Sequence, residues 1–227
     1  MYTNSTTQQT TAMPLHVIGE PHYRSSDHPP VITLAGAAHW SLFKYITSAS
    51  GLPLSDQEKA LITENVKVKK LRKRQYFLQE GDVCKYMGFI TKGAFRMFSV
   101  NERGQESILD FALENSWIAD HESFNNEGYS AYHIEALEDT EMLVINSRQL
   151  KRMIEQMPAL SVMFRQYQAQ QLISAQKRIN AALSMTAEER YHDLLKCMPQ
   201  YAQRFSQNML ACYLGLKPET ISRIRKR

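Results

Sequence analysis

The sequence has few cysteines and no long apolar run, and these two absences exclude several classes of protein. Its 227 residues include three cysteines, which are scattered and odd in number: Cys84, Cys197 and Cys212. This spacing fits neither a disulfide framework nor a metal-ligand cluster, and it suits a reducing compartment. No apolar stretch approaches the roughly 18 residues that span a bilayer, and the first residues lack a signal-peptide pattern. We therefore predict a cytoplasmic protein with no membrane partner.

The familiar catalytic patterns are also missing. The chain has no glycine-rich phosphate loop, no Ser-His-Asp set and no nucleophile elbow. We therefore predict that it is not an enzyme, that it has no catalytic or metal-binding residues, and that it needs no cofactor. The hydrophobic fraction of 43% is nevertheless sufficient for a substantial core.

Changes in composition and periodicity divide the chain into four parts. Residues 1–35 are rich in Thr, Ser, Gln and Pro and read as a mobile leader. Residues 36–157 contain two helical patterns and then short segments of period two, which predict an antiparallel β-roll of about eight strands with flanking helices. Residues 158–184 form one long helical pattern, and residues 185–227 are again helical. The predicted fold class is α+β.

The long helical pattern is the first candidate interface. Its apolar residues recur at three- and four-residue steps and form one stripe: Leu160, Phe164, Leu172, Ala175, Ile179 and Leu183. A helix of this length, nearly 40 Å, exceeds what a roll needs for cover. We therefore expect it to pair with a second copy of the chain, with simple packing on the strands as the alternative.

The last 22 residues have the pattern of a helix-turn-helix. Two short helical segments, 206–214 and 218–226, meet at Gly215, which permits a positive φ at a tight turn. The apolar residues that would hold the two helices together are Leu210, Leu214, Leu216, Ile221 and Ile224. An ordinary helical hairpin at the end of a globular domain is the alternative.

Positive charge is concentrated in the same segment. From residue 204 onward the net charge is +5, whereas residues 1–203 sum to −1. The basic residues of this tail are Arg204, Lys217, Arg223, Arg225, Lys226 and Arg227. Positive charge beside a helix that fits a DNA groove favours binding to phosphates, so the sequence predicts double-stranded DNA as a partner.

The order of roll, long helix and terminal helix-turn-helix resembles the Crp/Fnr superfamily of bacterial transcription regulators. Residues 187–191 and 213–226 are similar to phrases typical of the branch common in Bacteroidetes. The resemblance covers about residues 38–227. It implies a sequence-specific transcriptional regulator that binds DNA as a homodimer and contacts RNA polymerase.

The resemblance also implies which residues touch DNA. The base-reading positions fall on Glu219 and Arg223, four residues apart on one helix face. A glutamate can accept from a cytosine amine, and an arginine fork can bind guanine. The alternative is an ion pair between these two side chains within the helix. The residues expected to contact the DNA backbone are Ser206, Lys217, Thr220, Ser222, Arg225 and Lys226.

The roll departs from the cyclic-nucleotide-binding members of the superfamily. Those members have Gly-Glu for the ribose and Arg-Ser for the cyclic phosphate, whereas this chain has Ala119-Asp120 and Ser130-Ala131. A phosphate leaves water only for a paired cation or several donors, so we do not expect cyclic AMP to bind. The effector is not identified by the sequence. The residues of the expected effector pocket are Trp117, Ala119, Asp120, His121, Ser130, Ala131 and Tyr132.

Two other kinds of site have weaker support in the sequence. Residues 1–83 contain no cysteine, which argues against an iron–sulfur cluster there. A cupin-like metal-dependent enzyme or metal sensor is the alternative function, with His121 and His133 in the roll as candidate ligands. Their spacing does not match the tight His-x-His of that family.

Overall fold

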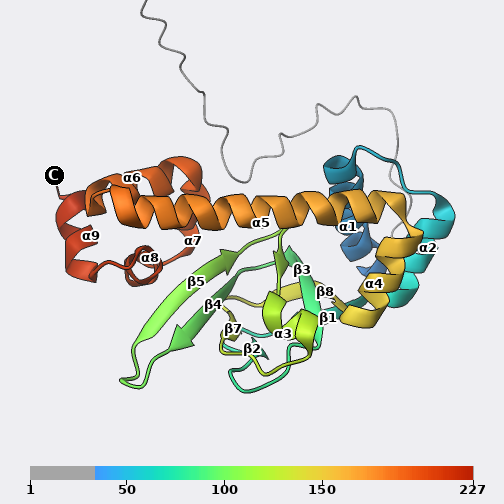
Figure 1. Ribbon diagram of the computed structural model, residues 1–227, viewed down its shortest axis with the longest axis horizontal. Helices are drawn as coiled ribbons and strands as arrows, with labels where there is room; N and C mark the ends of the chain where they lie inside the picture. Colours follow the sequence, from blue (N-terminus) through green and yellow to red (C-terminus); the bar gives the residue numbers. More distant parts are fainter. Residues whose placement is uncertain (1–33, 227) are drawn as a thin grey trace, which may run out of the picture.

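The segments of period two form antiparallel strands that build a two-sheet roll. The computed structural model describes residues 34–226, and the strands of this part form two four-stranded sheets (Figure 1). The first sheet has the order β1 (Lys67–Leu71), β8 (Thr140–Asn146), β3 (Tyr86–Lys92), β6 (Trp117–Ile118). The second has the order β2 (Tyr76–Leu78), β7 (His133–Ala136), β4 (Phe95–Val100), β5 (Glu106–Ala112). The predicted α+β class and β-roll are confirmed.

The space between the sheets is filled by large side chains. Fully buried residues come from both sheets, and they include Phe89, Ile90, Phe95, Ile134 and Leu143. The turn between β3 and β4 needs glycine, because Gly93 has a φ of +93° and an added Cβ would lie 2.6 Å from Thr140 Cγ2. The centre of the roll is therefore a packed hydrophobic core.

Short helices cover the roll on one side and close one of its ends. Helix α1 (Leu34–Ser50) packs on α5 and β3, and α2 (Asp56–Asn65) begins with a capping box made by Ser55 and Glu58. Helix α3 (His121–Asn126) follows β6, and α4 (Ser147–Gln156) follows β8. Helix α1 begins at Leu34, two residues before the predicted boundary at residue 36, and the rest of the predicted leader, residues 1–33, lies outside the described residues.

Helix α5 (Pro158–Ser184) runs along the molecule from the roll to the carboxyl-terminal helices (Figure 1). Its apolar stripe divides into two parts. Leu160 and Phe164 are buried in the core of the roll, so they are not available to a second copy, which corrects the predicted interface. The reason is that the roll covers only the first turns of α5, up to Tyr167. Beyond that point the stripe is exposed, with Leu172, Ile179 and Leu183 exposing 62%, 61% and 83%.

Four helices form the carboxyl-terminal unit: α6 (Ala187–Cys197), α7 (Pro199–Arg204), α8 (Gln207–Leu214) and α9 (Pro218–Arg225). Helix α6 begins with a capping box made by Thr186 and Glu189. The unit shares a second hydrophobic cluster with the outer face of β4 and β5. Among residues 34–226 no helix is long and apolar enough to cross a membrane.

Candidate nucleic-acid interface

The turn between α8 and α9 has the geometry that its glycine predicts. Gly215 ends α8 in the left-handed region, with φ of +64°, and its N–H bonds to the carbonyls of Ala211 and Cys212. The N–H of Leu216 bonds to the carbonyl of Ala211 at 2.8 Å. Ala211 and Ile221 are fully buried between the helices, so the pair forms one rigid unit.

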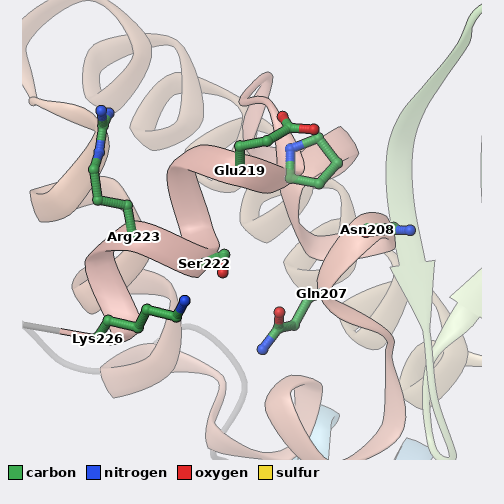
Figure 2. Close-up of a pocket in the computed structure, with 7 residues that line it drawn as sticks. Gln207, Asn208, Glu219, Ser222, Arg223 and Lys226 are labelled. Atoms are coloured by element: carbon green, nitrogen blue, oxygen red, sulfur yellow. The ribbon is translucent and has the colours of Figure 1, made fainter.

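The two predicted base-reading side chains lie on an exposed face of α9. Glu219 and Arg223 are both exposed, and they point away from one another in Figure 2. The ion pairs of the described part of the chain do not include one between them. Both groups are therefore free to bind base edges, as carboxylate acceptor and guanidinium donor.

A groove of about 620 Å³ lies between α9 and the first turn of α8. Ser222 and Lys226 border it from α9, and Gln207 and Asn208 border it from α8 (Figure 2). Gln207 and Asn208 are not among the residues predicted to contact DNA. Their position directly after the cap of α8 could have indicated a DNA contact, because polar side chains in the first turn of a helix lie beside its free N–H groups.

Of the residues expected to contact the DNA backbone, Ser222 and Lys226 line this groove. Ser206 caps α8 and its hydroxyl accepts from the N–H of Met209 at 3.3 Å. Lys217 precedes α9 without a side-chain cap bond, and Pro218 occupies the first turn. The other members differ in exposure: Thr220 and Ser222 are half-buried, whereas Arg225 and Lys226 are exposed. Their contact with DNA stays a prediction.

One basic residue of the tail does not belong to this surface. Arg204 ends α7 and forms ion pairs with Glu114 and Glu138 of the roll, at 3.2 and 2.8 Å. Its charge is therefore compensated within the protein, which corrects its inclusion in the charge that faces DNA. The sequence count could not reveal this, since both partners lie far away along the chain.

The predicted effector pocket contains a closed hydrogen-bond network. Asp120 is buried, and its carboxylate accepts from the hydroxyl of Ser130 at 2.7 Å. It also accepts from the N–H groups of Glu122 and Ser123, at 3.0 and 3.3 Å, and so caps α3. The Asp120–Ser130 pair thus satisfies its own polar atoms and places negative charge where the resemblance puts a ligand-binding residue.

The other expected pocket residues differ in exposure. Trp117 and Ala119 are buried in the core, where the Trp117 ring lies 5.5 Å from that of Phe164. Ala131 is exposed and Tyr132 is half-buried. This corrects the expectation that Trp117 and Ala119 line an open pocket, because β6 carries Trp117, and the chain directly after β6 carries Ala119, into the packed core of the roll.

The two histidines of the metal alternative have separate partners. His121 Nε2 lies 3.1 Å from the hydroxyl of Tyr167 on α5, and burial lowers the pKa of this histidine. His133 Nδ1 accepts from the N–H of Glu80 at 3.2 Å. Within residues 34–226 no group of three or more His, Cys, Asp and Glu side chains is arranged to hold a metal ion. The geometry therefore does not favour the cupin-like alternative.

Comparisons with known proteins agree with this architecture. The cyclic nucleotide-binding domain family matches residues 68–157. The chain is 26% identical over 165 residues to the transcriptional activator protein anr of Pseudomonas aeruginosa, covering 68% of this chain and 67% of that protein. It is 25% identical over 206 residues to the transcriptional regulatory protein btr of Bordetella pertussis, covering 84% and 83%.

The solved structure of FixK2 from Bradyrhizobium japonicum has the same fold. It superposes with a TM-score of 0.61 at 21% sequence identity, covering 71% of this chain and 83% of that one. The Bacteroidetes-type branch stays a prediction. The chain is a member of the Crp/Fnr family of DNA-binding transcriptional regulators, which are not enzymes, and its β-roll is a domain of the cyclic nucleotide-binding type.

Proposed function

We propose that the chain binds a near-palindromic DNA site as a homodimer, with α9 of each copy in the major groove. The observation that carries this proposal is the exposed, unpaired presentation of Glu219 and Arg223 beside the groove between α8 and α9. Two copies would place their α9 helices on half-sites about 34 Å apart, one turn of DNA. Contact with RNA polymerase follows from the resemblance as a further expectation.

The exposed part of the α5 stripe is the dimer contact in this proposal. Leu172, Ala175, Ile179 and Leu183 follow one another at three- and four-residue steps and are all exposed. A row of exposed aliphatic side chains on one helix is costly in water and is typical of a surface that a second copy covers. The roll domains would then lie on either side of the paired α5 helices.

The roll acts in this proposal without cyclic AMP. A cyclic phosphate would meet the buried carboxylate of Asp120, and the hydroxyl of Ser130 already donates to that carboxylate. A like charge in a buried site raises the cost of bringing the phosphate out of water. Calorimetric titration of the protein with cyclic AMP is expected to show no saturable heat, and micromolar binding would contradict this part.

Selection of bound DNA from a random pool tests the main proposal. The parent chain is expected to enrich a sequence with twofold symmetry. Against that sequence, Arg223→Ala should lose about 1–3 kcal/mol and discriminate less at one base pair of each half-site. Lys151→Ala, which alters an exposed lysine on α4 at the other end of the molecule, is the matched control. Undiminished binding and discrimination by Arg223→Ala would refute the assigned role of α9.

A further inference from the structure

The guanidinium of Arg204 is turned toward the roll and joins two of its loops. Its Nε and Nη2 donate to Glu138 at 2.8 and 2.9 Å. Its Nη1 and Nη2 donate to Glu114 at 3.3 and 3.2 Å. Glu114 lies between β5 and β6, and Glu138 lies between β7 and β8. Both contacts are two-point, a geometry that fixes direction as well as distance.

One of the two acceptors, Glu114, is itself held in place. Glu114 also accepts from the N–H of Gly93 at 2.8 Å, so its carboxylate is oriented independently of Arg204. Burial by itself would raise the pKa of Glu114, but the hydrogen bonds from Arg204 and from backbone N–H groups outweigh it and lower the pKa. The roll therefore presents a charged and oriented site to the last residue of α7.

Neighbouring contacts join the same two parts of the chain. The hydroxyl of Tyr201 on α7 donates to the carbonyl of Phe111 on β5 at 3.1 Å. On α8, Cys212 Sγ accepts from the N–H of Ile108 at 3.3 Å and lies 3.2 Å from the carbonyl oxygen of Glu106. The helix-turn-helix unit is thus docked on β5, and this contact leaves the reading face of α9 exposed.

We infer that Arg204 is a positioning residue: by tying α7 to Glu114 and Glu138 it sets the direction in which the roll presents α9. This inference rests on the proposed function. Both α9 helices of a dimer meet a two-half-site operator only when each is held at the right angle and separation. Without these ion pairs the helix-turn-helix unit adopts other orientations relative to the roll. This lowers the effective concentration of the second α9 at its half-site.

The competing role for Arg204 is a direct contact to a DNA phosphate, as its place in the basic tail first suggested. The two roles predict opposite effects for the acidic partners. If Arg204 binds phosphate, removal of a nearby carboxylate frees the guanidinium and leaves DNA binding equal or stronger. If Arg204 positions the unit, removal of the carboxylate weakens binding as removal of Arg204 does.

Binding of Arg204→Gln, Glu138→Gln and Glu114→Gln to the selected operator and to a single half-site distinguishes these roles. Each variant is expected to bind the full operator about tenfold more weakly and the half-site within about twofold of the parent. The dependence of the logarithm of affinity on the logarithm of salt concentration should keep its slope. Loss on both DNAs in Arg204→Gln alone, with a slope reduced by about 0.9, would show a phosphate contact instead. Tighter operator binding by any of the three would overturn the inference.

Hydrogen exchange in the free protein tests, without DNA, whether the ion pairs of Arg204 hold α7 on the roll. Amides of α7 are expected to exchange faster in Arg204→Gln and in Glu138→Gln than in the parent, whereas amides of β3 in the core of the roll should keep their rates. Unchanged exchange in α7 would refute the tie. A parent chain that selects no DNA would refute the proposed function instead, and the exchange result would still decide whether Arg204 holds the unit.

Discussion

The ring of Phe111 on β5 stacks on the ring of Phe205, which lies between α7 and α8. The two centroids are 3.9 Å apart and the planes are inclined by 12°. Both side chains are buried, and Tyr201 closes one edge of the pair. This stack joins the outer face of the roll to the helix-turn-helix unit, so the stability of the unit depends on a residue of the sheet.

Phe205→Ala is expected to lower the free energy of unfolding by about 3–5 kcal/mol, because it leaves a cavity beside Phe111 and exposes that ring. Urea unfolding followed by circular dichroism measures the loss. Tyr129→Ala provides the control, since Tyr129 exposes 83% of its surface and its removal should cost little. An equal cost for the two variants would show that the stack contributes no particular stability.

Asp110 is expected to make the stability of the protein depend on pH. Burial raises its pKa to about 6, although the charge of Arg178 and the N–H of Phe111 act in the opposite direction. The folded state therefore holds this proton more tightly than the unfolded state, and the free energy of unfolding should fall as pH rises from about 4 through 6.

Asp110→Asn removes this titration. The amide oxygen can still accept from the N–H of Phe111, so the variant should be about 1–2 kcal/mol more stable than the parent at pH 7.5 and similar to it at pH 4.5. Thermal unfolding at the two pH values measures the difference. A constant difference across this range would mean that Asp110 does not titrate there.

Lys226 is expected to add affinity for DNA without adding specificity. It is exposed beside the groove between α8 and α9, where an ammonium group reaches phosphates of any sequence. Lys226→Ala should weaken binding to operator and random DNA alike and reduce the salt slope by about 0.9. Fluorescence anisotropy at several salt concentrations measures both effects. If the variant lost affinity for the operator only, Lys226 would be a base-reading residue.

Ile179 is the residue with which the dimer contact can be tested. Ile179→Glu places a charge in the exposed apolar row of α5, so we expect a monomer that binds the full operator at least tenfold more weakly. Gln170→Glu is the matched control, because nine residues correspond to two and a half turns and place Gln170 on the opposite face. Sedimentation velocity gives the assembly state. A dimeric Ile179→Glu protein would place the interface elsewhere.

Several elements could be predicted because their cause is local. The period of two between Val66 and Ile145 predicted the strands of the roll, since alternate side chains of a strand face opposite sides. The capping boxes at Ser55 and Thr186 are likewise local patterns, and each lies at the start of a helix. Gly215 predicted the turn of the helix-turn-helix, because a left-handed φ strongly favours glycine. Each of these depends on residues within a few positions of one another.

The errors concerned partners that are distant along the chain. The stripe on α5 is continuous in sequence, and only the extent of the roll decided that Leu160 and Phe164 are core residues while Leu172 and Ile179 are exposed. Likewise, the charge of Arg204 was counted as part of a basic tail, but Glu114 and Glu138 compensate it from 90 and 66 residues away.

The sequence by itself determined the kinds of element, their order and the chemistry of the helix that would read DNA, since periodicity, caps and turn residues act over a few neighbours. The tertiary structure alone decided which of those side chains remain available. Docking of α7 and α8 on β5 paired Arg204 of the basic tail with Glu114 and Glu138 and left Glu219 and Arg223 exposed. Exposure is a property of surfaces brought together from distant segments, and no short stretch of sequence contains it.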